Sequence, residues 1–188
     1  MIRQVEYFEK GGKENSERCI EISASLVEEG FKHLVVATTV GDTGVAMAKR
    51  VQGKDVNLVV VTHSAGFKEA NQSELLPDNR DEIIRLGGKI YTGTILTHSI
   101  ETAFAQKFNG LYPTMIVAQS LRRFGEGPKV CCEIVMEACD AGLIPEFEEV
   151  VAVAGTGRGA DTVCIIKSAA SKRFLDLKVL EILAKPRG

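Results

Sequence analysis

A short apolar run that ends in a cluster of Gly and Thr constrains the fold of this 188-residue chain more than any other feature. Residues 34–37 read Leu-Val-Val-Ala, which is the pattern of a β-strand buried on both faces. Residues 38–44 form a turn, after which apolar side chains recur at helical spacing through Val51. In open α/β sheets, ligands bind at such strand–turn–helix corners, where free backbone N–H groups and the helix dipole suit an anion.

A second corner follows the apolar strand predicted at 150–154. Its loop consists of Gly155, Thr156, Gly157, Arg158, Gly159 and Ala160. We expect the sheet to bring this loop beside the first corner. The loop also fits G-x-G-x-x-[G/A], the dinucleotide fingerprint, but residues 162–166 favour a strand where that fingerprint requires a helix. We therefore expect glycines that allow close backbone approach, and no Rossmann-type NAD site.

The remaining segments alternate between helical and strand patterns within one expected domain, 1–188. Residues 1–14 read as an extended arm, and Asn15 or Ser16 can cap the helix that follows it. Thr97 or Ser99 can cap a later helix. Helices are expected at 16–29, 45–51, 78–86, 99–107, 113–121 and 130–141. Further strands are expected at 56–62, 89–92, 162–166 and 175–183, the last at a sheet edge.

Composition excludes several classes of partner. The net charge of −2 leaves no broad basic surface for nucleic acid, and no apolar run reaches the roughly 18 residues of a membrane span. Five cysteines, an odd number without C-x-x-C spacing or a nearby His, indicate reduced thiols in a cytoplasmic protein and no metal site. Cys131 and Cys132 are adjacent on a predicted helix, and we expect them to be packing residues. A homo-oligomer is compatible with this composition.

The first corner is a candidate phosphate cradle. Thr38, Thr39 and Thr43 supply hydroxyl donors, while Gly41 and Gly44 let the backbone come close to a ligand. The alternative is a turn that needs Gly and a helix cap. The motif lacks G-x-x-x-x-G-K-[ST], which argues against a nucleoside triphosphatase.

Other candidate residues each have two interpretations. His63 and Gly66 belong to a small-residue corner after the strand at 56–62; His63 is either a general acid or base or, the reading we favour, a hydrogen-bonded wall residue. Arg122 and Arg158 could pair with a ligand phosphate or lie solvated in loops. Asp161 is a candidate base or ligand contact. No catalytic constellation is recognisable, so the catalytic residues and the reaction stay unknown.

With both corners in view, the chain resembles the C-terminal α/β domain of pyruvate kinase. It is similar in particular to stand-alone proteins of this type from archaea and bacteria. The segments that carry the resemblance are 35–44, 58–62, 121–127, 140–145 and 151–162. The resemblance covers roughly residues 14 to 185.

The resemblance implies a three-layer α/β/α sandwich with a mostly parallel sheet and an antiparallel edge strand. In pyruvate kinase, the loops that match 38–43 and 155–159 can hold a sugar bisphosphate effector, and the stand-alone family is associated with flavin mononucleotide (FMN) at this crevice. Asp42 adds negative charge to the first loop, so a monophosphate fits better than a bisphosphate. The catalytic barrel of the kinase is absent, so kinase activity is not implied.

Three functions follow as hypotheses. The first is a phosphate-anchored protein that binds FMN at the carboxyl ends of the strands, with oxidoreductase activity as an option supplied by the cofactor. The second is a non-catalytic regulatory sensor of phosphorylated metabolites. The third is a hydrolase or transferase with His63 or Asp161 as its base.

Overall fold

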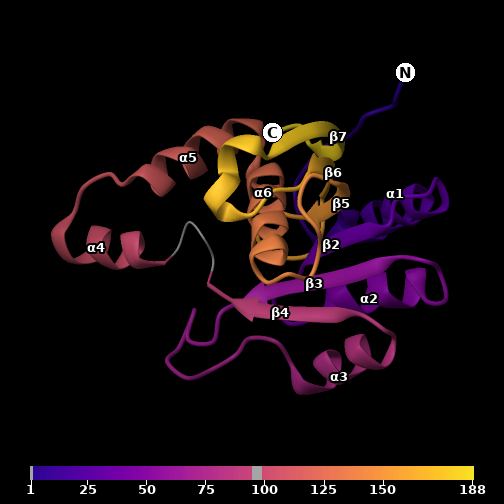
Figure 1. The fold of residues 1–188 in the computed structure, drawn as a ribbon, viewed down its shortest axis with the longest axis horizontal. Helices are drawn as coiled ribbons and strands as arrows, with labels where there is room; N and C mark the ends of the chain where they lie inside the picture. Colours follow the sequence, from indigo (N-terminus) through magenta and orange to yellow (C-terminus); the bar gives the residue numbers. More distant parts are fainter. Residues whose placement is uncertain (1, 95–98) are drawn as a thin grey trace.

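The computed structural model describes residues 2–94 and 99–188, which form an α/β fold around one seven-stranded sheet (Figure 1). The strands are β1 (Glu6–Phe8), β2 (His33–Ala37), β3 (Asn57–His63), β4 (Lys89–Gly93), β5 (Glu149–Ala154), β6 (Thr162–Lys167) and β7 (Lys178–Pro186). The helices are α1 (Ser16–Glu28), α2 (Asp42–Val51), α3 (Pro77–Arg85), α4 (Ile100–Phe108), α5 (Pro113–Leu121) and α6 (Glu126–Asp140), with short 3-10 turns η1 (Lys13–Asn15), η2 (Arg122–Phe124) and η3 (Ser171–Asp176).

The strand order is β1-β7-β6-β5-β2-β3-β4. β2 pairs in parallel with both β3 and β5, in a register that sets Val35 opposite Val59 on one side and Ala152 on the other. Because β2 and β5 are parallel neighbours, the loops that follow them emerge side by side at one edge of the sheet. The predicted adjacency of the two corners is confirmed.

The sheet is mostly parallel, as expected, and its antiparallel strand is β6, which pairs with β5 and β7. The segment expected as an edge strand, 175–183, corresponds largely to β7. Its outer side is covered by β1, where Glu6 lies opposite Ala184 in a parallel pairing. The extended arm predicted at 1–14 therefore contributes a strand, and β1 and β4 form the two edges.

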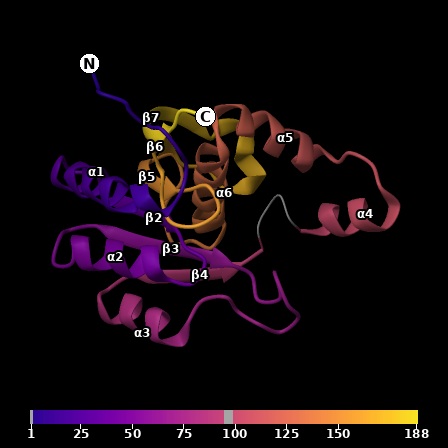
Figure 2. The ribbon, with the colours of Figure 1, turned by 180° about the vertical axis from the view of Figure 1, so that it is seen from behind.

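Two core layers sandwich the sheet, because successive side chains of each strand point to opposite faces. Leu34 and Val36 pack with α1, α2 and α3, whereas Val35 packs with α6. Figure 2, seen from behind, shows α1, α2 and α3 together on one side of the sheet, with α6 beyond it. The three-layer α/β/α architecture that the resemblance implied is confirmed.

The two helices between β4 and α6 do not cover the sheet. α5 contacts α6 and η2, and α4 lies farther out as a projection from the body (Figure 1). Within α4, as far as the structure describes it, no residue is buried. Ser99 immediately precedes α4, while Thr97 and His98 lie outside the described residues.

All five cysteines are free and buried, as expected of packing residues. Cys131 and Cys132 are fully buried on α6, and the Cys131 thiol lies 3.5 Å from the carbonyl oxygen of Ala152. Burial raises the pKa of Cys132 to about 12 and that of Cys139 to about 11. Thiolate, the reactive form, is therefore scarce at neutral pH.

We predict that native protein at pH 7.5 resists alkylation by iodoacetamide. Mass spectrometry should find none of the five thiols modified on a timescale that fully labels the denatured chain. Rapid native labelling of Cys131 or Cys132 would contradict the packing described for α6.

Candidate functional site

The candidate site lies beside β2, where the order in which the strands are added to the sheet reverses. From β2 the chain passes through α2 to β3 on one side, whereas β5 lies on the other side of β2. α2 and α6 pack on opposite faces, so a crevice opens outside the carboxyl ends of β2 and β5. A cavity of about 300 Å³ occupies this position.

Nine of the residues proposed from the sequence line this cavity. They are Thr38, Thr39, Thr43, His63, Arg122, Gly155, Gly157, Arg158 and Gly159. The other five, Gly41, Gly44, Gly66, Thr156 and Asp161, lie outside its lining. The structure therefore gathers residues from the ends of β2, β3 and β5 and from η2 around one space.

The loop after β2 is ordered by its own side chains. Thr38 Oγ1 accepts a hydrogen bond of 3.1 Å from the Gly41 N–H, and Asp42 Oδ1 accepts one of 2.9 Å from the Thr43 N–H. The N–H groups of Thr39 and Val40 donate to no acceptor among the residues that the structure describes. Thr39 lines the cavity, so its N–H and the N-terminus of α2 are donors at this position.

Gly41 and Gly44 are required for packing. A Cβ atom at Gly41, whose φ is 103°, would lie 2.5 Å from the Asn79 Cβ. At Gly44 it would lie 2.8 Å from Val60 Cγ1 and 2.9 Å from Ile83 Cδ1. These two glycines shape the corner by letting α2 sit close to β3 and α3.

Asp161 holds the Gly-rich loop. It is fully buried, and its Oδ2 accepts hydrogen bonds of 2.9 Å from the N–H groups of Gly12 and Thr156. Its Oδ1 accepts a hydrogen bond of 2.9 Å from the hydroxyl of Thr162. Asp161 thus ties the arm to the loop from behind the site, and this geometry does not present it to the cavity as a base.

Lys13 of the arm and Ser16 at the start of α1 support the far end of this loop. Ser16 Oγ, expected as a helix cap, instead accepts a hydrogen bond of 2.9 Å from the Ala160 N–H. A Cβ at Gly159 would lie 2.5 Å from the Lys13 Cα, and one at Gly155 would lie 2.5 Å from the Gly159 carbonyl oxygen. Gly157, with φ of 77°, has no atom within 4 Å of its Cβ position. Only Gly157 therefore faces open space at the cavity.

β6 follows the Gly-rich loop directly, so the helix that a dinucleotide fingerprint requires is absent there. The prediction of a strand at residues 162–166 is confirmed by β6. The glycines serve the close backbone approaches just described.

His63 belongs to the wall of the cavity. Its Nδ1 lies 2.7 Å from Glu74 Oε2, and its ring centroid lies 4.2 Å from that of Phe67. Gly66, with φ of 84°, turns the exposed loop that carries these partners. The carboxylate fixes one imidazole nitrogen, which agrees with the interpretation of His63 as a hydrogen-bonded wall residue.

Arg122 and Arg158 differ in whether a carboxylate already pairs with the guanidinium group that a ligand anion would need. Arg122 Nε donates a hydrogen bond of 2.7 Å to Glu126, so a ligand would compete with a carboxylate. The exposed Arg158 forms no ion pair with any carboxylate in the described parts of the chain. Arg158 is the cation better placed to meet an anion at the Gly-rich loop.

Sequence reasoning missed a charged stripe on α6. Lys129, Glu133 and Glu137 are each at most 3% exposed, and all three line the cavity. Lys129 Nζ forms an ion pair with Glu133. The i, i+4, i+8 spacing was visible in the sequence, but such a spacing is also that of an ordinary solvated helix face.

Glu137 is the most perturbed carboxyl of the stripe. Its Oε2 atom is buried and has no hydrogen-bond partner among the described residues. Burial, with help from the charge of Glu133, raises the pKa of Glu137 to about 8. Its carboxyl group is therefore largely protonated at neutral pH.

No group of three or more His, Cys, Asp or Glu side chains is arranged to hold a metal ion in residues 2–94 and 99–188. None of the helices in that part of the chain is both long and apolar enough to cross a membrane.

Comparison with known proteins gives one family. The profile of the family described as "Pyruvate kinase, alpha/beta domain" matches residues 19–166. Among solved structures, a crystal structure of O-ureido-L-serine synthase is similar over 72% of this chain at 17% sequence identity, with a TM-score of 0.31. This chain spans 41% of that protein's chain, and a similarity of this size carries no argument about function.

We predict that Asp161→Ala destabilises the fold by ~3 kcal/mol, because three hydrogen bonds to a buried carboxylate are lost. Chemical denaturation of the variant and of wild type measures the difference. Limited proteolysis should also cleave the arm near Gly12 faster in the variant. The matched control is Asp176→Ala at an exposed position, expected to change stability by less than ~0.5 kcal/mol. Equal effects of the two substitutions would refute the anchoring role.

Glu137 makes stability depend on pH in a defined direction. The folded state keeps a proton on Glu137 up to about pH 8, whereas the unfolded state releases it near pH 4.5. The contribution of Glu137 to the free energy of unfolding therefore falls as the pH rises between those values. The free energy of unfolding of wild type minus that of Glu137→Gln should fall by up to ~1.4 kcal/mol per pH unit in that window. Urea titrations from pH 4.5 to 8.5 test this, and a difference that stays constant would rule it out.

Proposed function

Because this chain belongs to the pyruvate kinase alpha/beta domain family, we propose that it binds a small phosphorylated molecule in the crevice between β2 and β5, and that this molecule is FMN. The observation that carries the proposal is the convergence of two loops with unused backbone donors at one cavity. The Thr39 N–H, which meets no acceptor among the described residues, comes from one loop, and Gly157 presents backbone without a covering side chain on the other.

A phosphate fits the chemistry of this corner. The dipole at the N-terminus of α2 favours an anion, the Thr39 and Thr43 hydroxyls can donate to it, and Arg158 can pair with it. Asp42 is the one acidic group in the loop, and two contacts offset its charge. Its Oδ1 caps the Thr43 N–H, and its Oδ2 lies 3.2 Å from Lys13 Nζ. The corner can therefore accept negative charge despite Asp42.

The rest of the cavity favours a flavin over a sugar bisphosphate. Apolar side chains of Val61, Val130 and Ile134 line it, as suits a planar ring. Along α6 the lining carries Glu126, Glu133 and Glu137 against one buried lysine. Arg122 and Lys129 already pair with Glu126 and Glu133, and Glu137 is largely protonated, so among the described residues this wall offers a second phosphate no cation that lacks a carboxylate partner.

Different residues would hold the phosphate and the ring of FMN. Thr39, Thr43, Gly157 and Arg158 would meet the phosphate, and the apolar wall beside α6 would meet the ring. When bound, the flavin would supply any redox chemistry, and the protein would orient the ring and limit access of water. We assign no catalytic residue.

We predict that Thr43→Val weakens FMN binding by ~10- to 100-fold, because a hydrogen bond to a charged group is worth ~1.5–3 kcal/mol. Riboflavin, which lacks the phosphate, should bind wild type and Thr43→Val with equal, low affinity. Isothermal titration calorimetry with both ligands measures this contrast, and circular dichroism checks that the variant is folded.

Two outcomes would contradict the proposal in different ways. Equal losses for FMN and riboflavin would mean that Thr43 only supports the start of α2. No binding of FMN to wild type would reject FMN as the ligand. The matched control is Thr114→Val, a change of the same kind on α5 outside the cavity, for which FMN affinity should stay unchanged.

A further inference from the structure

The charged stripe of α6 lies along the cavity away from the phosphate corner. Arg122 and Glu126 stand at the start of α6, where Gly127 packs against Thr162 at the Gly-rich loop. Lys129 to Glu137 extends ~12 Å farther along the helix at a rise of 1.5 Å per residue. Glu137 is thus the lining residue of α6 that lies farthest along the helix from the phosphate corner.

Glu137 is buried, and one of its carboxyl oxygens has no hydrogen-bond partner among the described residues. Its side chain is 2% exposed, its Oε2 makes no hydrogen bond among the described residues, and it lines the cavity. An unpaired buried carboxyl costs stability, and an apolar residue of similar size would pack there without that cost. The position is therefore suited to a group that arrives with a ligand.

We propose that Glu137 recognises the heterocyclic head of the bound molecule through an amide- or imide-type edge, in which an N–H lies beside a C=O. A protonated carboxyl carries one donor and one acceptor side by side, which is the complement of such an edge. Sugar phosphates lack this edge, whereas flavins and related heterocycles carry it. This inference rests on the function proposed above and specifies the class of ligand.

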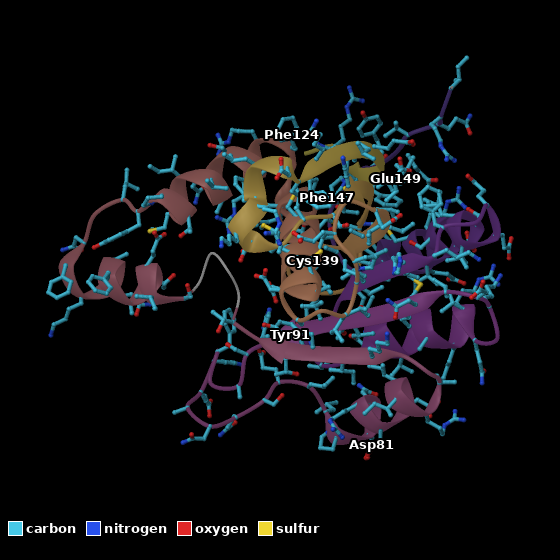
Figure 3. All side chains as sticks on the ribbon, in the orientation of Figure 1. Asp81, Tyr91, Phe124, Cys139, Phe147 and Glu149 are labelled. Atoms are coloured by element: carbon cyan, nitrogen blue, oxygen red, sulfur yellow. The ribbon has the colours of Figure 1, made fainter. Side chains whose placement is uncertain are left out.

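The surroundings of Glu137 keep its carboxyl group protonated, which is the form that this recognition requires. On α6, Glu133 and Asp140 oppose its ionisation and Lys129 favours it. From β4 the phenol of Tyr91 faces the same region, and the pKa of Tyr91 is raised by burial and by the charges of Glu137 and Asp140 (Figure 3). The cavity walls from β2 and β3 contribute Ala37, Val61 and Thr62, with His63 at the strand end. With its pKa raised to about 8, Glu137 can donate its O–H at neutral pH.

The test compares two substitutions at one position. Glu137→Gln keeps a donor and an acceptor, so FMN affinity at pH 7 should stay within ~3-fold of wild type. Glu137→Met keeps the approximate volume but removes both groups, so affinity should fall by ~10- to 100-fold. Because Met removes an unpaired buried carboxyl, the variant should fold, and its melting temperature verifies this. Glu149→Gln, at an exposed residue labelled in Figure 3 and remote from the cavity, is the control.

Two further readouts separate recognition from a structural role. From pH 7 to pH 9, wild type should lose ~10-fold in FMN affinity relative to Glu137→Gln, because only the carboxyl is deprotonated. FMN methylated at its imide nitrogen lacks the N–H; it should bind wild type at least ~10-fold more weakly than FMN, and Glu137→Met should bind both equally.

Each outcome is decisive. If wild type binds FMN and Glu137→Met binds it equally well, or if methylation weakens binding to both proteins alike, the role of Glu137 is overturned and the phosphate site stands. If wild type binds neither FMN nor its methylated form, the proposed function fails and the inference fails with it. Near wild-type FMN affinity in Glu137→Gln together with weakened affinity in Glu137→Met supports both the proposed function and the role of Glu137.

Discussion

The parallel pairing of β2 with β5 is the contact on which the site depends. Because Val35 lies opposite Ala152, the two strands end at the same level and their loops share one edge of the sheet. A slip of one residue would turn Val35 toward the opposite core layer, so burial on both faces fixes the register. The geometry of the candidate corner is therefore set by the packing of the strands that carry its two loops.

Much of the fold was predictable because its signals are local. Apolar runs of strand length, helical periodicity and helix start and stop residues located the helices α1 to α6 and the strands β2 to β6, and Pro113 marked the start of α5. β1 was predicted only as an extended arm. Its sequence, Glu-Tyr-Phe, has no buried residue, and its place is fixed by backbone pairing with β7. Such pairing leaves no pattern in the sequence.

The loops of the site were predictable from the sequence, whereas the wall that α6 forms was not. Gly and Thr at strand ends are local features with a direct physical meaning, and they identified both corners. The charged face of α6 reads as solvated in isolation, whereas in the fold Lys129, Glu133 and Glu137 are at most 3% exposed and line the cavity. The role of Asp161 depends on Gly12, 149 residues away, so no local pattern could reveal it.

The hydrogen bonds from Gly12 and Thr156 to Asp161 have a consequence for biosynthesis. Domains begin to fold while the ribosome still extends them from the N-terminus. β2, α2 and the first loop are made early, and Lys13 of the arm can pair with Asp42 as soon as both are made, but the acceptor of the Gly12 N–H appears only when Asp161 has left the exit tunnel. A nascent chain stalled before that point would lack this anchor of its arm, and would carry the first loop without the Gly-rich loop that lies beside it in the folded protein.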